Sequence, residues 1–129
     1  MLSRVAPNLG VSSLPLDKVS RDSDVVRAYF DDPLISKNKI RARMGVELLG
    51  AMAMVDAGAP SLQLPVLILH GSDDVLSPAA ASRHLEQRVG SPDKTLTIYE
   101  GLWHEIFNEP ERDRVVADVR SWLVHQLAH

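Results

Sequence analysis

The sequence predicts an α/β fold of single-domain size, because its second half alternates between strand and helix patterns. The chain has 129 residues, about the length of one domain. The apolar run Leu64–Leu69 is followed by a helical pattern, then by a β-rich alternating segment, then by a second helical pattern. This order is a βαβα unit, in which the two strands are expected to be parallel.

The first half has a mostly helical pattern. Residues 1–20 contain two prolines and a glycine among scattered apolar positions, and are predicted to be irregular. A short amphipathic helix is predicted over Asp22–Phe30, ending before Pro33. A longer one is predicted over about Lys39–Asp56, with one apolar stripe formed by Met44, Leu48, Met52 and Val55. Such a stripe usually packs inside the protein, and the alternative is that it contacts a lipid substrate.

The second half carries local signals for each of its elements. The branched, uninterrupted run Leu64–Leu69 predicts a strand buried on both faces. Ser77–Pro78 predicts a helix start, with the hydroxyl at the N-cap and proline at the first helical position. Thr95–Tyr99 alternates and predicts the second strand. Asn108 is predicted to cap the last helix, with Glu111 three residues later as in a capping box.

Two strands alone do not explain a strand buried on both faces. Sheets of this type have about 5–6 strands, so we expect neighbours of Leu64–Leu69 that the sequence does not contain. An unpaired apolar strand edge is a site for self-association. The pattern changes near Gly58–Pro60, which divides the chain into residues 1–60 and 61–129.

Composition excludes several classes of function. The formal net charge is −3, which is unlike the basic surface of a nucleic-acid-binding domain. No cysteine is present, so disulfides, thiolate nucleophiles and cysteine-bound metals are excluded. Neither metal nor cofactor is expected. The longest apolar run is far shorter than the ~20 residues of a membrane span, and no secretory signal is recognisable, so a cytoplasmic protein is expected.

Two segments with chemically useful side chains directly follow the predicted strands. His70–Asp74 follows the first strand and Gly101–Glu105 follows the second. Because parallel strands end at the same edge of a sheet, an acid and a histidine are expected to meet there. A carboxylate that orients an imidazole is two thirds of a Ser-His-Asp arrangement. The nucleophile motif Gly-x-Ser-x-Gly occurs nowhere in the sequence.

Short motifs occur along nearly the whole sequence, in this order: Ser20-Arg21-Asp22, Asp32-Pro33-Leu34, Pro65-Val66-Leu67, His70-Gly71-Ser72-Asp73-Asp74, Ile98-Tyr99-Glu100-Gly101, His104-Glu105 and Asn108-Glu109-Pro110-Glu111. In the order and spacing of these motifs the chain resembles the C-terminal half of an α/β-hydrolase of the monoacylglycerol lipase/lysophospholipase group. In that group the order along the chain is Ser, Asp, His. The resemblance implies that Asp74 is the catalytic acid and His104 the catalytic base.

The resemblance also implies an architecture and an activity. Residues 1–60 would be the later part of a helical cap, and residues 61–129 the C-terminal part of the hydrolase core. The nucleophile and oxyanion hole would belong to an earlier half. The implied reaction is hydrolysis of a monoacylglycerol or lysophospholipid, by a protein in the cytoplasm or peripheral to a membrane. The chain alone is expected to be inactive, and the alternative is a non-catalytic remnant or subunit that binds a partner chain or an apolar ligand.

Several neighbours of the two site residues have simpler interpretations. Asp73 is interpreted as a solvated turn residue, and His70 as a structural residue close to the site. Trp103 is expected to pack beside the site. Glu109 and Glu111 are interpreted as acids favoured at the start of the last helix by its dipole.

Overall fold

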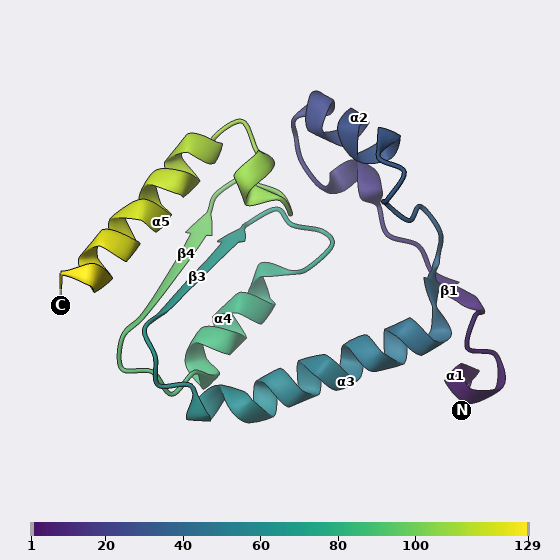
Figure 1. Ribbon diagram of the computed structural model, residues 1–129, viewed down its shortest axis with the longest axis horizontal. Coiled ribbons are helices and arrows are strands. Elements are labelled where there is room, and N and C mark those ends of the chain that lie inside the picture. Colours follow the sequence, from purple (N-terminus) through teal and green to yellow (C-terminus); the bar gives the residue numbers. More distant parts are fainter. Residues whose placement is uncertain (1, 129) are drawn as a thin grey trace.

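The computed structural model describes residues 2–128 and consists of a helical N-terminal region followed by a βαβα unit (Figure 1). Residue 1 of the predicted segment 1–60 and residue 129 of the predicted segment 61–129 lie outside the described residues. The N-terminal region comprises α1 (Leu2–Val5), β1 (Gly10–Ser12), a 3₁₀ turn (Leu16–Lys18), α2 (Ser23–Asp31), β2 (Ile40–Arg41), α3 (Ala42–Gly58) and a second 3₁₀ turn (Ala59–Ser61).

The first twenty residues are more regular than predicted. They include α1 and β1, and β1 pairs with β2 in an antiparallel ladder. The backbone N–H of Ala42 also donates to the carbonyl of Leu9, at 2.8 Å. The sequence prediction was wrong here because the pairing partner lies some thirty residues further along the chain, where no local pattern reveals it.

Helix α2 lies where the sequence predicts it, to within one residue at each end. Asp22 is its N-cap, and the Asp22 side chain accepts a hydrogen bond from the backbone N–H of Asp24 at 2.9 Å. The helix stops at Asp31, before Pro33, as expected from the effect of proline on the residues before it.

Helix α3 begins at Ala42 rather than near Lys39, because residues 40–41 belong to β2. Its apolar stripe is largely exposed among the described residues: Met44 is 60% exposed and Met52 56%. In Figure 1 this helix runs along one side of the molecule and joins the β1–β2 ribbon to the βαβα unit. No helix within residues 2–128 has both the length and the apolar character required to cross a bilayer.

The second half is the predicted βαβα unit. Its elements are β3 (Val66–Gly71), α4 (Ala79–Arg88), β4 (Lys94–Tyr99) and α5 (Arg112–Leu127). Strands β3 and β4 are parallel, with Val66 opposite Lys94 and Gly71 opposite Tyr99. The core lies between the sheet and α5, where Leu69 packs against a buried cluster of Tyr99, Leu102, Ile106 and Val115.

Strand β3 is less buried than the sequence predicts. Only Ile68 and Gly71 are buried, and the other four residues are half-buried. The physical reason is that β4 is its single neighbour in the sheet that the described residues form.

Two predicted helix caps are wrong. Helix α4 has Pro78 rather than Ser77 at its N-cap, without a side-chain hydrogen bond. The backbone N–H of Ser77 donates to Asp74 instead. Asn108 ends a 3₁₀ turn (Ile106–Asn108), and Glu111 is the N-cap residue of α5. In both places the segment before the helix is held by side chains distant in the sequence or in the neighbouring loop, and these contacts displace the helix start.

Candidate active site

The loops that follow β3 and β4 are locked together at one edge of the sheet. A Cβ atom at Gly71 would clash with the carbonyl oxygens of Leu102 and Trp103, so only glycine allows this close approach. Gly101 has a φ of +77°, a left-handed conformation that favours glycine. Its N–H donates to the Ser72 hydroxyl at 2.8 Å, which joins the two loops. The two loops therefore have a fixed relative position.

The carboxylate of Asp74 is the centre of this edge. Asp74 is 7% exposed. Its Oδ1 accepts hydrogen bonds from the backbone N–H groups of Leu76 and Ser77, at 2.8 and 2.9 Å. Its Oδ2 lies 2.8 Å from Nδ1 of His104. The backbone bonds hold one oxygen of the carboxylate, and the other is directed at the imidazole.

The orientation of His104 follows from this contact. An ionised carboxylate only accepts hydrogen bonds, so Nδ1 of His104 carries the proton and Nε2 is left as an acceptor. The His104 side chain is 41% exposed. Within residues 2–128, Nε2 has no hydrogen-bond partner. The contact with Asp74 therefore leaves Nε2 without a partner among the described residues.

The pKa of Asp74 is lowered from its ordinary value. Burial alone would raise this pKa, but hydrogen bonds from His104 and from the backbone N–H groups of Ser77 and Leu76 favour the charged form and outweigh burial. The carboxylate is thus ionised at neutral pH, which is the state that orients a neutral imidazole and stabilises its protonated form.

His70 lies behind Asp74 and is held on both ring nitrogens. Its Nε2 donates to the carbonyl of Ser77 at 2.6 Å, and its Nδ1 lies 2.7 Å from the Ser82 hydroxyl. The same Nε2 is 3.2 Å from Oδ2 of Asp74. His70 joins β3, the Asp74 loop and α4, as expected of a structural residue close to the site.

Asp73 is separated from His104 by its orientation. It is exposed and accepts a hydrogen bond from the hydroxyl of Ser72 at 2.7 Å. Trp103 lies beside the site, and the ammonium group of Lys18 is 4.8 Å from the centre of the indole ring. The structure thus brings Asp74 and His104 together and directs Asp73 elsewhere.

The sequence interpretation missed an ion pair next to this site. Glu109 is fully buried, with 0% of its surface exposed, and its Oε2 lies 2.5 Å from Nε of Arg21. Glu111 also contacts the guanidinium of Arg21. The interpretation of Glu109 as a helix-dipole charge was therefore wrong, whereas Glu111 does lie at the start of the last helix, as the N-cap residue of α5. The available signal was that both acids and Arg21 fall within the motifs that carry the family resemblance.

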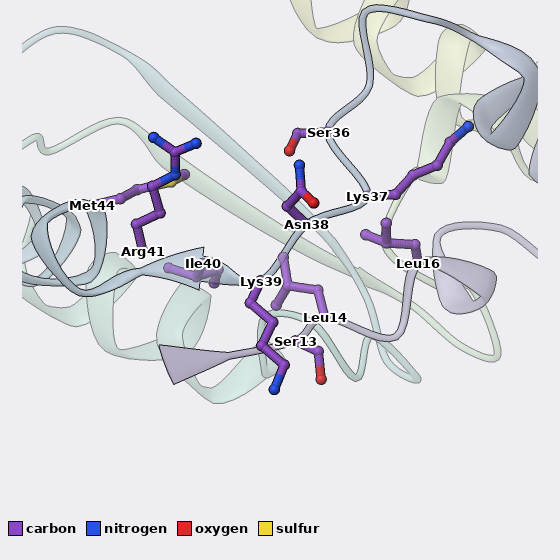
Figure 2. A pocket seen from close by; sticks show the side chains of 10 residues that line it. All are labelled: Ser13, Leu14, Leu16, Ser36, Lys37, Asn38, Lys39, Ile40, Arg41 and Met44. Atoms are coloured by element: carbon purple, nitrogen blue, oxygen red, sulfur yellow. The ribbon is translucent and has the colours of Figure 1, made fainter. Parts of the chain in front are cut away.

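The described residues include no group of three or more His, Cys, Asp or Glu side chains arranged to hold a metal ion. A separate hollow lies beside the β1–β2 ribbon, and Figure 2 shows the side chains that line it. Its cations, Lys37, Lys39 and Arg41, point in different directions and do not converge on one anion (Figure 2). Asp74 and His104 are therefore the better candidates for chemistry.

Comparison with known protein families identifies the family of this chain. The family model described as "Serine aminopeptidase, S33" matches residues 1–111. The chain belongs to this family. Among relatives of this S33 family chain, the monoacylglycerol lipase of Mycolicibacterium smegmatis is 43% identical over 127 residues, covering 98% of this chain and 45% of the relative. A phospholipase of Bacillus subtilis is 37% identical over 124 residues, covering 94% of this chain and 47% of the relative.

A solved structure supports the same fold. The monoacylglycerol lipase of Paleococcus ferrophilus matches with a TM-score of 0.85 at 32% identity, covering 96% of this chain and 49% of that one. The predicted fold class, part of an α/β-hydrolase, is confirmed. This S33 family chain spans about half the length of the relatives it matches.

Proposed function

We propose that this chain supplies the acid and the base of a Ser-Asp-His triad in an ester hydrolase that acts on a monoacylglycerol or a lysophospholipid. Asp74 is the acid and His104 the base. The observation that carries the proposal is the 2.8 Å contact between a buried, backbone-anchored carboxylate and an imidazole whose side chain is 41% exposed. The nucleophilic serine comes from residues other than these 129, either in the same protein or on another chain.

The proposed reaction uses His104 as a proton carrier. Nε2 takes the proton of the serine hydroxyl while the serine oxygen attacks the acyl carbonyl. The alcohol leaves with the proton held on Nε2, and an acyl-serine remains. Nε2 then takes a proton from water while the water oxygen attacks the acyl carbon. The bond between the acyl carbon and the serine oxygen breaks, the serine oxygen takes the proton back from Nε2, and the fatty acid is released. Asp74 stabilises the imidazolium that forms in each step.

The apolar surface of the N-terminal region supports a lipid substrate. We propose that residues 1–60 are the later part of a helical cap and residues 61–129 the end of the hydrolase core. Helix α3 exposes a run of large apolar side chains, and a groove of about 560 Å³ between α3 and α4 is lined mainly by Leu48, Ala51, Met52, Val55, Ala81 and Leu85. We further propose a cytoplasmic location with contact at a membrane surface, where such lipids reside.

The proposal is tested by restoring the other half. The chain is joined behind the N-terminal part of the Mycolicibacterium relative that the match leaves uncovered, and release of oleate from 1-monooleoylglycerol is measured. His104→Ala is expected to reduce turnover by at least ~10³, because no base remains to activate the serine. Arg27→Gln is the control, since it breaks only an exposed pair with Asp24 at 3.0 Å on the surface of α2, and it is expected to leave turnover unchanged.

Substrate comparison separates the alternatives. Oleoyl lysophosphatidylcholine distinguishes the two proposed lipid classes, and alanine p-nitroanilide tests the aminopeptidase activity that the family description names. Cleavage of the anilide alone would contradict the proposed substrate class. A folded but inactive joined protein would favour the alternative, a non-catalytic subunit that binds a partner chain or an apolar ligand.

A further inference from the structure

Four consecutive residues before α2 contact the segment that carries His104, and the contacts follow the same order along both segments. Lys18 lies over Trp103, and the carbonyl of Val19 accepts a hydrogen bond from the backbone N–H of Glu105 at 2.8 Å. The contacts continue with residues 20 and 21, described below. We call residues 18–21 together with residues 103–111 the clasp. Figure 1 shows its two segments close together, in purple ahead of α2 and in green between β4 and α5.

The middle of the clasp is nearly closed to solvent. Val19 and Ser20 are each 1% exposed. The Ser20 hydroxyl donates to the carbonyl of Asn108 at 2.9 Å and accepts from the backbone N–H of Asp22 at 3.0 Å. Asp22 is the N-cap of α2. The clasp therefore connects the start of α2 directly to the loop after His104.

The end of the clasp is an ion pair in which Glu109 is fully buried and the Arg21 side chain is 32% exposed. The Arg21 backbone N–H donates to Oε1 of Glu109 at 2.8 Å, and Nε of the same residue donates to Oε2 at 2.5 Å. The other side of the guanidinium contacts Glu111. These hydrogen bonds, Glu109 first, raise the pKa of Arg21 against the opposing effect of burial. A fully buried carboxylate is costly unless it is paired, so this pair has a specific partner requirement.

We infer that Arg21 and Glu109 are positioning residues for His104, and that they fasten the α2 region to the loop that carries the proposed base. The inference deepens the proposed function and rests on it for the role of His104 as the base. The contacts that support the inference do not depend on that role. His104 is exposed and is held by one hydrogen bond, to Asp74. Its neighbours in sequence are held by residues before α2: Lys18 contacts Trp103, and the carbonyl of Val19 accepts a hydrogen bond from Glu105. Loss of the Arg21–Glu109 ion pair therefore gives the loop that carries His104 more freedom to move.

The test uses the 129-residue chain labelled with ¹⁵N in its histidine rings. Long-range ¹H–¹⁵N correlation spectra report which ring nitrogen carries the proton. In the parent chain, His104 is expected to show one tautomer with the proton on Nδ1. Glu109→Gln turns an acceptor toward Nε of Arg21 into a donor, and is expected to replace the single pattern by a mixture of tautomers.

Two further variants make the result specific. Arg21→Lys keeps the positive charge but not the planar fork, so an intermediate mixture is expected. Arg27→Gln is the matched control, because it breaks an exposed arginine–acid pair with Asp24 at 3.0 Å and is expected to leave His104 unchanged. His84 contacts Asp56 at the end of α3, and its signals are expected to stay constant in all variants.

In the joined enzyme described above, Arg21→Lys is expected to lower kcat by about 10–100-fold with little change in KM, because a displaced base affects the chemical step. A parent chain without the Nδ1–H tautomer would contradict the Asp74–His104 contact and hence the proposed function. An unchanged His104 pattern in folded Glu109→Gln and Arg21→Lys chains would overturn the clasp inference alone. So would simultaneous change of all histidine signals in both variants, since that indicates a general structural role.

Discussion

The two halves of the chain use their apolar residues differently. In the βαβα unit, Tyr99, Leu102, Ile106 and Val115 form a buried cluster against the sheet. In α3, by contrast, only Ala42 is buried, and the large apolar side chains of that helix face outward. The described residues thus contain a core for the site, whereas most of the apolar surface of α3 stays exposed.

The N-terminal region is held to the βαβα unit mainly by polar contacts. One end is the clasp at Arg21 and Glu109. The other is Asp56 at the end of α3, which lies 2.7 Å from Nε2 of His84 and 3.3 Å from Nε of Arg88. The hydrogen bond from His84, followed by the effect of Arg88, lowers the pKa of Asp56. Polar contacts at two points fix the position of the region and leave its apolar face open.

The largest expected effect concerns activity. The 129-residue chain alone is expected to hydrolyse no ester and to react with no fluorophosphonate probe, because it lacks a Gly-x-Ser-x-Gly motif and the oxyanion donors that accompany it. A short-chain p-nitrophenyl ester assay and mass spectrometry of probe-treated protein check this. Stoichiometric labelling of any serine would contradict it.

The second effect concerns association. Strand β3 has one neighbour in the described sheet, and α3 exposes apolar side chains. We therefore expect dimers or larger species in size-exclusion chromatography with light scattering. A monodisperse monomer with a sharp cooperative melt would show that these surfaces do not associate.

The third prediction compares one leucine from each half. Leu102→Ala removes a side chain that is 4% exposed, and is expected to lower the free energy of unfolding by about 2–5 kcal/mol. Leu49→Ala changes a residue that is 67% exposed, and is expected to stay within about 0.5 kcal/mol. Urea unfolding of the two variants measures both. Equal losses would mean that α3 is packed in solution.

The smallest effect concerns Tyr99, whose hydroxyl donates to Oδ2 of Asp118 at 3.0 Å. Burial first, then Asp118, raises the pKa of Tyr99 to about 12. Because the pKa of Tyr99 is higher in the folded than in the unfolded state, the stability that its hydroxyl contributes is fully present below about pH 10, the pKa in the unfolded state. That stability is lost as pH rises toward the pKa in the folded state.

Tyr99→Phe is expected to cost about 1 kcal/mol at pH 7 and to flatten the loss of stability between pH 9 and 11. Urea unfolding of the parent and the variant at pH 7, 9 and 11 measures both effects. The same alkaline slope in the variant and the parent would assign the loss to another group.

The sequence predicted the βαβα unit because its elements carry local signals. Branched runs, proline positions and helical spacing determined the order and the parallel pairing of β3 and β4. Asp74 and His104 were predictable for a topological reason: parallel strands bring the loops after them to one edge. The choice of Asp74 over Asp73 came from the family resemblance, and the turn geometry now gives it a physical basis.

The remaining features depend on contacts between distant residues. Glu109 resembles an ordinary acid near a helix start, and only the fold brings Arg21 to it from 88 positions earlier in the sequence. The pairing of β1 with β2, and the displaced starts of α4 and α5, have the same origin. Periodicity in α3 correctly indicated a helix, but it did not indicate what the apolar face contacts.

The most direct test of the central claim compares the two adjacent aspartates in the joined enzyme. Asp74→Asn is expected to lower turnover of 1-monooleoylglycerol by ~10⁴, because an amide in place of the carboxylate leaves the histidine in the wrong tautomer. Asp73→Asn changes an exposed residue bonded to Ser72 and is expected to retain most of the turnover. Loss of turnover in Asp73→Asn with activity preserved in Asp74→Asn would contradict the assignment of Asp74 as the acid that orients His104.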